Sequence, residues 1–247
     1  MRKVKIVLGI AILLAVVILV TSVPNFYLVV LGVGVPLFLI GMSFSIRSQF
    51  FLKSVLKTTE NNVLLSFDDG PDPVNTPLIL DILKEHGATA LFFLIGKNVN
   101  GNEALVRRIH EEGHLLGSHS FSHDPKMGFW NMLKVTKDIS AGHEGLLKIV
   151  PEAGNLYRPP FGVINPTIAL AIGNCGLQSV GWTVRSFDTV KKDPHKLLNR
   201  LNRKINGSDI VLLHDTQTQT VSILDSLIVN LKKRELTLRA CLKAELN

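Results

Sequence analysis

In VLLSFDDGP, residues 63–71, a short and largely apolar run ends at two acidic residues, Asp68 and Asp69. An apolar run closed by Gly-Pro predicts a buried β-strand over residues 63–67. Two adjacent carboxylates at a strand end cannot both point the same way, so one can bind a metal ion while the other faces a substrate. The structural alternative is a turn in which the aspartates cap a helix.

Outward from this stretch, short apolar runs alternate with helical patterns as far as residue 241. The runs predict strands over residues 63–67, 89–95, 114–117, 156–158, 177–182, 209–213 and 236–241. The helical patterns predict helices over residues 77–86, 103–112, 127–149, 166–174, 194–205 and 221–232. This alternation predicts an α/β fold of about seven parallel strands with crossover helices, either an open sheet or a barrel.

The first 47 residues have a different composition. No charged residue occurs in the 41 positions of residues 6–46. This segment is too long for one membrane span of about 20 residues and about right for two. Residues 22–25 supply a turn, so we expect a transmembrane helical hairpin over residues 6–20 (extending at most to 24) and 26–46. The predicted organisation is a membrane anchor (1–47), a polar connector (48–61) and a catalytic domain (62–247).

The net charge of +7 is also local. Residues 1–57 hold six basic and no acidic side chains, and the other residues hold 21 basic and 20 acidic ones. The excess therefore flanks the membrane segment, and we expect a lipid bilayer as partner and no nucleic acid. A signal peptide is an alternative for the first apolar segment, but a second apolar segment follows at once and no cleavage site is evident. The sequence does not indicate an oligomeric state.

The orientation of the hairpin is open. Basic residues lie on both outer flanks, so the positive-inside rule places both ends, and the catalytic domain, in the cytoplasm. A cell-wall substrate would need the domain on the outer side. The two arguments conflict, and the multi-pass membrane location is predicted without a side.

Residues of catalytic interest end or follow five of the predicted strands. In chain order they are Asp68 and Asp69; His119 and His123; Arg158, Pro159 and Pro160; Asp188; and His214 and Asp215. The carboxyl ends of parallel strands carry the active site in β/α barrels. The sequence therefore predicts one active site at this rim.

A metal site is the first function that these residues predict. His119 and His123 are four residues apart, and on a helical turn this spacing puts both imidazoles on one face. With Asp69 they form a set of two histidines and one carboxylate, which leaves coordination positions open for water and substrate. An incidental histidine pair is the alternative.

A hydrolase needs a base and an acid in addition. Asp68 is the candidate base, and His214, which titrates near neutral pH, is the candidate acid. Arg158 could hold Asp68 ionised, and Asp188 could hold His214 protonated. The structural alternatives are a surface guanidinium for Arg158 and a helix cap for His214.

Four motifs in order resemble those of the polysaccharide deacetylase family, also called the NodB-homology domain or carbohydrate esterase family 4. They are SFDDGP (66–71), HSFSH (119–123), RPPFG (158–162) and LLHD (212–215). The resemblance extends over residues 62–241. It implies a distorted (β/α) barrel and the hydrolysis of the N-acetyl group of N-acetylglucosamine-type glycans, with release of acetate.

The resemblance also implies a role for each site residue. A divalent ion, zinc first and cobalt, nickel or manganese as alternatives, would be held by Asp69, His119 and His123. Asp68 would be the base, paired with Arg158, and His214 the acid, tuned by Asp188. The backbone N–H of Phe161 would stabilise the oxyanion, with Pro160 and Trp182 beside it in the substrate groove.

The fourth motif departs from the family pattern. It reads GWTVRSFDT over residues 181–189, with Thr189 in place of a usual Trp and Arg185 where some members have Asp. The groove wall is therefore altered, and peptidoglycan, a chitin-like oligomer and a glycolipid precursor all stay open as substrates. Two other functions are alternatives: hydrolysis of a small non-sugar amide, and glycan binding without catalysis, which would predict loss of a ligand or of the base.

Overall fold

The structure is a computed structural model that describes residues 2–21 and 23–242. Ser22 of the predicted turn and residues 243–247 of the predicted catalytic domain lie outside the described residues. The strands are β1 (Leu64–Gly70), β2 (Leu91–Leu94), β3 (Leu115–Ser118), β4 (Leu156–Tyr157), β5 (Gln178–Ser179), β6 (Val184–Arg185) and β7 (Ile210–His214). The α-helices are α1 (Arg2–Val20), α2 (Phe26–Ser43), α3 (Asn75–Glu85), α4 (Gly96–Val99), α5 (Glu103–Glu111), α6 (Met132–Leu147), α7 (Pro166–Asn174), α8 (Pro194–Lys204) and α9 (Thr218–Lys232). Three 3-10 helices complete them: η1 (Ile46–Ser48), η2 (Met127–Phe129) and η3 (Pro160–Gly162).

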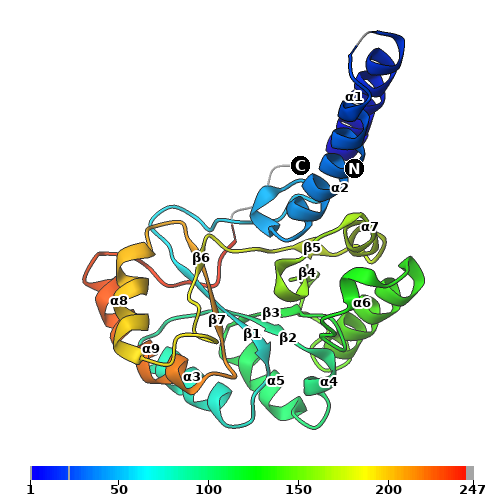
Figure 1. Cartoon of the computed structure of the whole chain (residues 1–247). Helices are drawn as coiled ribbons and strands as arrows, with labels where there is room; N and C mark the ends of the chain where they lie inside the picture. The colour runs from blue at the N-terminus through cyan, green and yellow to red at the C-terminus, as the bar shows by residue number, and fades with distance from the viewer. Residues whose placement is uncertain (1, 22, 243–247) are drawn as a thin grey trace.

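The seven strands form one parallel sheet in the order β5-β4-β3-β2-β1-β7-β6, which confirms the predicted α/β fold. Strand β1 lies near the centre, and its apolar side chains are buried on both faces. Leu65 and Phe67 pack with helices α3 and α9, whereas Leu64 packs with Phe93 and Trp182 inside the curve of the sheet. A strand covered on both faces needs a nearly continuous apolar sequence, and four of residues 63–67 are apolar, with Ser66 the exception. Figure 1 shows the helices arranged around this half-barrel.

A short segment before β1 joins the two sides of the half-barrel. We call residues 54–58 the closing segment. The N–H of Val55 donates to the carbonyl of Ser179, and Val55 accepts from the N–H of Gly181, both at 2.8 Å. At its other end the N–H of Thr58 donates to the carbonyl of Ser208 at 3.0 Å, just before β7. The predicted connector therefore includes a buried piece that pairs with both edges of the barrel opening.

Two strand predictions differ from the structure. Residues 236–241 form no strand in the described part of the chain; only Thr237 makes an isolated bridge, to Asn62. The Asn62 side chain takes the place of a strand partner, since it accepts from the N–H of Arg239 at 2.9 Å. The seventh strand is instead β6, a two-residue strand beside β7 that the sequence did not single out.

The helix predicted over residues 127–149 is divided. The 3-10 helix η2 comes first, and α6 begins only after Asn131, whose side chain accepts from the N–H of Lys134 at 2.9 Å. Asn in extended backbone is a strong helix N-cap, so a new helix starts here rather than continuing from η2.

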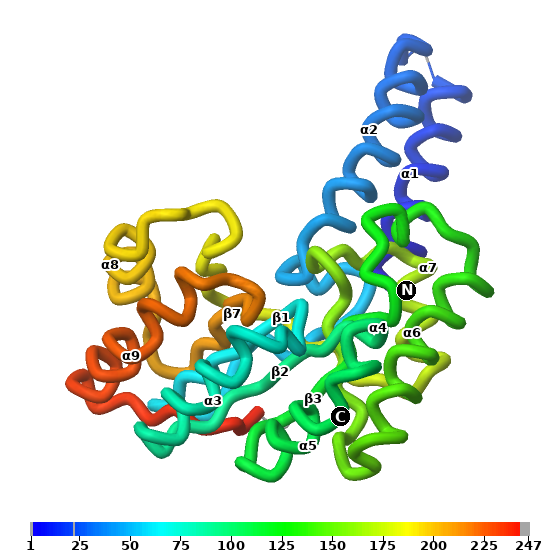
Figure 2. The backbone as a smooth tube through the Cα atoms, turned by 90° about the horizontal axis from the view of Figure 1, so that it is seen from below, coloured from blue at the N-terminus to red at the C-terminus, as the bar shows by residue number. Residues whose placement is uncertain are grey.

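Helices α1 and α2 form an apolar hairpin that projects from the domain (Figure 1). Both are long and apolar enough to cross a membrane. Helix α2 ends at Ser43, three residues before the predicted end of the second span. At the foot of the hairpin, Lys3 Nζ donates to the carbonyl of Gln49 at 2.8 Å. In the view of Figure 2, helices α3, α8 and α9 lie to the left of the central strands and α6 and α7 to the right.

Candidate active site

A polar pocket of about 250 Å³ opens at the carboxyl ends of the strands. It brings together the five predicted metal ligands and proton-transfer residues from three separate stretches of chain: Asp68, Asp69, His119, His123 and His214. The parallel register explains the meeting, because Asp68 on β1 lies opposite His214 on β7, and His119 follows directly after β3. The active-site rim predicted from the strand ends is thus one cluster in space.

Asp69, His119 and His123 converge at the centre of the pocket, and their donor atoms all lie within 4.8 Å of one another. Asp69 Oδ1 lies 3.5 Å from His119 Nε2 and 3.3 Å from His123 Nε2. This carboxylate oxygen is buried and has no hydrogen-bond partner among the described residues. A buried carboxylate oxygen facing two imidazole nitrogens leaves space for a cation that all three share. The residues therefore fit a divalent metal ion.

The surroundings of His119 fix which of its nitrogens is free. Its Nδ1 donates to the carbonyl of Arg158 at 2.7 Å, which leaves Nε2 as the acceptor directed at Asp69. Burial lowers the pKa of His119 to about 3, so the ring is neutral. A neutral imidazole held by a backbone carbonyl is the usual arrangement of a histidine metal ligand.

The spacing of His119 and His123 suggested a helical turn, but the structure has no helix there. Residues 119–123 form a bent loop in which Ser120 (φ 64°) and His123 (φ 53°) have left-handed backbone. The hydroxyl of Ser120 accepts from the N–H of His123 at 3.0 Å, and the two ring centroids lie 4.9 Å apart. The prediction that both imidazoles share one side is met by this loop rather than by a helix.

Helix α6 holds the loop from behind. Asp138 accepts from the N–H groups of Phe121 and Ser122, each at 3.2 Å. Gly142, one turn further along α6, lies so close that a Cβ atom there would be 2.6 Å from the carbonyl of Ser120. This support could not be predicted from the sequence, because Asp138 and Gly142 lie outside every motif.

Asp68 and Arg158 form a buried ion pair behind the metal site. Arg158 has no exposed surface, and its Nη1 lies 2.7 Å from Asp68 Oδ1. Nη1 also donates to Ser66 Oγ at 2.9 Å, and Nε and Nη2 donate to the carbonyls of Val180 and Gly181. Burial raises the pKa of Asp68, and the positive charge of Arg158 opposes that rise. A carboxylate with a raised pKa is a stronger base than one at the surface.

Ser66 belongs to this arrangement although it was not among the predicted site residues. Alternate residues of a strand share a face, so Ser66 and Asp68 both point toward Arg158. The period-2 pattern of the strand was the signal that could have found it.

His214 stands on the other side of the metal site, with its Nε2 4.0 Å from Asp69 Oδ2. Its Nδ1 lies 2.7 Å from Asp188 Oδ1, and its backbone N–H donates to Asp188 Oδ2 at 2.7 Å. Burial alone would lower the pKa of His214, but the hydrogen bond and charge of Asp188 outweigh it and raise the pKa. Asp188 is itself buried and accepts from Thr220 Oγ1 at 2.8 Å.

Aromatic and apolar side chains make the walls of the pocket. Phe161 has left-handed backbone (φ 58°), and its ring centroid lies 4.7 Å from that of His123. Gly162 approaches the Trp182 ring so closely that a Cβ atom would lie 2.5 Å from it. Arg185 and Thr189, where the sequence departs from the family pattern, both line the pocket. Pro160 lines an adjacent apolar cavity instead.

Asp215 is a buried carboxyl that the sequence reasoning placed at the rim without a role. It accepts from Thr76 Oγ1 at 2.6 Å and packs against Gly70, where a Cβ atom would collide with it. Burial raises its pKa to about 7. Its hydrogen bond with Thr76 joins the start of α3 to the residue that follows β7.

Comparison with known proteins identifies the family of this chain. Residues 56–180 match the family of polysaccharide deacetylases. This chain belongs to the polysaccharide deacetylase family. The family confirms the predicted enzyme class, a hydrolase of carbon–nitrogen bonds, and the predicted fold.

Two curated deacetylases are similar to this chain over about 70% of its length. The peptidoglycan-N-acetylglucosamine deacetylase of Bacillus cereus is 35% identical over 180 residues, which are 71% of this chain and 84% of the relative. The peptidoglycan-N-acetylmuramic acid deacetylase PdaA of Bacillus subtilis is 31% identical over 187 residues, 74% of this chain and 71% of the relative.

A solved structure shows that the fold alone does not guarantee catalysis. A mutant with restored activity of a CE4 family pseudoenzyme from Bacillus anthracis has a TM-score of 0.69 and 27% identity, over 74% of this chain and 68% of that one. In the present deacetylase, a carboxylate and two histidines are in place around one point, which is what a hydrolytic metal site requires.

Proposed function

We propose that this deacetylase hydrolyses the N-acetyl group of N-acetylglucosamine or N-acetylmuramic acid units in a glycan and releases acetate. The observation that carries the proposal is the placement of two proton-transfer groups on either side of the three candidate ligands. Asp68 Oδ2 lies 3.9 Å from His119 Nε2, and His214 Nε2 lies 4.0 Å from Asp69 Oδ2. An amide carbonyl placed between them would meet a base on one side and an acid on the other.

Asp69, His119 and His123 would hold a divalent ion, with zinc the first choice for two imidazoles and one carboxylate. When bound, the ion polarises the amide carbonyl and makes water more acidic. The buried Asp69 Oδ1 without a hydrogen-bond partner supports this assignment.

The protein side chains supply the proton transfers. Asp68 takes a proton from the attacking water as its oxygen forms a bond to the acetyl carbon. His214 then donates a proton to the sugar nitrogen as the carbon–nitrogen bond breaks, which leaves acetate and a free amine. The N–H of Phe161 donates to the carbonyl oxygen as negative charge develops there. Arg158 contacts the base Asp68, and Asp188 contacts the acid His214, so both act as positioning residues.

The hairpin of α1 and α2 anchors the enzyme in the membrane in this proposal, with both ends on the same side. The contact between Lys3 and Gln49 supports a shared side, because it joins the start of α1 to the chain that follows α2. The basic flanks favour the cytoplasm for that side. A reporter fused to Asn247 tests this: an exported-type signal would overturn the cytoplasmic assignment.

Acetate release from N-acetylglucosamine oligomers, with and without a chelator, tests the activity. We expect release that stops with the chelator and returns when zinc is added. No release at any oligomer length, with metal shown to be bound, would contradict the proposal and favour glycan binding without catalysis. Release from a small non-sugar amide alone would instead indicate an amidohydrolase.

A further inference from the structure

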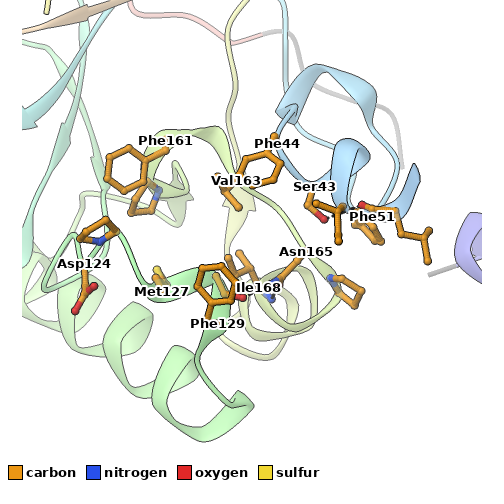
Figure 3. A pocket seen from close by; sticks show the side chains of 16 residues that line it. Ser43, Phe44, Phe51, Asp124, Met127, Phe129, Phe161, Val163, Asn165 and Ile168 are labelled. Atoms are coloured by element: carbon orange, nitrogen blue, oxygen red, sulfur yellow. Dashed lines mark hydrogen bonds between the residues drawn. The ribbon is translucent and has the colours of Figure 1, made fainter. Parts of the chain in front are cut away.

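An apolar cavity of about 340 Å³ lies between the foot of the hairpin and the catalytic pocket. Leu39 and Phe44, at the end of α2, form one wall, and Met127 and Ile168 belong to the opposite wall. Phe161 lies at the end of the cavity that is nearest to the catalytic pocket, and it lines that pocket as well (Figure 3). The two spaces therefore share one aromatic side chain as their partition.

The polar groups that line this cavity are already paired within the protein. Ser43 Oγ donates to the carbonyl of Leu39 at 3.0 Å. Asn165 donates to the carbonyl of Gly128 and accepts from the N–H of Ile168. Asp124 accepts from the N–H of Lys126 at 2.7 Å, and its carboxylate points away from the other lining side chains (Figure 3). A sugar placed here would give up hydrogen bonds to water without replacing them, so the cavity suits an apolar occupant.

The last residues of the predicted membrane span line the cavity. Helix α2 has no buried residue along its 18 positions, so the side that does not face α1 is free to meet lipid. Two aromatic side chains at the rim continue this apolar surface: Phe44 is 66% exposed and Phe129 is 91% exposed. Aromatic residues at the end of a span mark the membrane interface. An aliphatic chain can therefore reach the cavity from the bilayer without crossing water.

We propose that the cavity binds the aliphatic chain of a lipid-linked saccharide, while the N-acetylated sugar of that molecule lies in the catalytic pocket beyond Phe161. This rests on the proposed deacetylase function and names its substrate class as a glycolipid. The cavity has room for roughly ten methylene groups, if each takes about the 30 Å³ of a water molecule. Since the Phe161 and His123 rings are 4.7 Å apart, only one ring separates the chain from the metal ligands.

Two glycosides of di-N-acetylchitobiose, one methyl and one dodecyl, test the proposal with the full chain in detergent micelles. Burying one methylene group changes an equilibrium by about fourfold. We therefore expect kcat/KM for the dodecyl glycoside to exceed that for the methyl glycoside by at least about tenfold.

Partition of the dodecyl glycoside into the micelle would also raise the apparent rate of its deacetylation. A variant with a filled cavity separates this effect from binding in the cavity. Gly128→Leu places its side chain in the cavity with little strain, because the nearest atom to a Cβ there is Val163 Cγ1 at 3.9 Å. We expect this variant to lose the preference for the dodecyl glycoside and to keep the wild-type rate on the methyl one. Gly173→Leu, on α7 with no atom within 4 Å of its Cβ, is the matched control and should keep both rates.

The outcomes are distinguishable. Equal kcat/KM for the two glycosides in the wild type would overturn the proposal. The cavity would then bind bilayer lipid rather than substrate. A preference that survives Gly128→Leu would overturn it as well, because partition then explains the effect. No turnover of either glycoside by any of the three proteins would overturn the deacetylase function, and the glycolipid proposal with it.

Discussion

Asp188 contacts His214 twice, with Oδ1 on the ring Nδ1 and Oδ2 on the backbone N–H, both at 2.7 Å. One contact fixes the charge and tautomer of the imidazole, and the other fixes the position of its backbone. Such a double contact leaves Nε2 as the only ring nitrogen free to exchange a proton with a substrate.

Asp188→Asn should shift the pH dependence of deacetylation. The acid form of His214 is present below its raised pKa and is lost as the pH rises through it. Without the Asp188 charge, burial lowers the pKa of His214, so the alkaline limb of the kcat/KM profile moves to lower pH. At pH 7.5 we expect kcat to fall about tenfold or more. Asp193→Asn, an exposed helix cap on α8, should leave the profile in place; an unchanged profile for Asp188→Asn would contradict the role of Asp188.

Asp68→Asn and Asp69→Asn should separate catalysis from metal binding. Asp68 Oδ1 is bonded to Arg158, whereas Asp69 Oδ1 faces the two imidazoles. We expect Asp68→Asn to keep a bound metal ion and to lose about 10²–10⁴-fold in turnover. Asp69→Asn should lose the ion. Metal content by mass spectrometry, beside acetate release, checks both, and loss of metal in Asp68→Asn would mean that the two roles are reversed.

Arg158→Ala should destabilise the protein strongly. Its removal leaves Asp68 buried without its ionic partner, which costs about 3–5 kcal/mol in comparable buried pairs. For a chain of this size that corresponds to a fall of roughly 6–20 °C in Tm. Arg108→Ala removes a partly exposed pair with Asp81 and Glu112 and should cost at most about 1 kcal/mol. Similar Tm values for the two variants would show that Arg158 is not a buried structural charge.

Gly142→Ala should weaken metal binding from a distance. The added Cβ would lie 2.6 Å from the Ser120 carbonyl and would push the loop of His119 and His123 away from α6. We expect the zinc Kd to rise by about 10- to 100-fold, as when an outer-shell support is lost. Gly145→Ala on the same helix meets no atom within 4 Å. It should leave the Kd unchanged and stabilise the helix by up to about 1 kcal/mol.

The sequence predicted the α/β fold and the strand ends at which the candidate site lies. Asp68, Asp69, His119, His123 and His214 follow buried strands, and the ends of parallel strands must meet at one rim, so their convergence could be predicted. The bend at Ser120 and His123 could not, because it depends on Asp138 and Gly142 of a helix that no motif marks.

The missed strand and the wrongly predicted one have the same physical origin. Val184 and Arg185 form β6 only because β7 lies beside them, since two residues carry no periodic pattern of their own. Residues 236–241 have the pattern of a strand, but the side chain of Asn62 occupies the hydrogen-bonding position that a neighbouring strand would need.

The closing segment has a practical consequence for making the enzyme without its hairpin. Val55 pairs with the chain at Ser179 and Gly181, and Ile46 and Phe51 are buried against Trp182 and Val180 in the barrel interior. A truncated chain that begins at residue 62 would expose these strand edges and apolar side chains, and unpaired edges favour aggregation. A water-soluble version should therefore keep residues 46–61 and replace only the apolar hairpin before them.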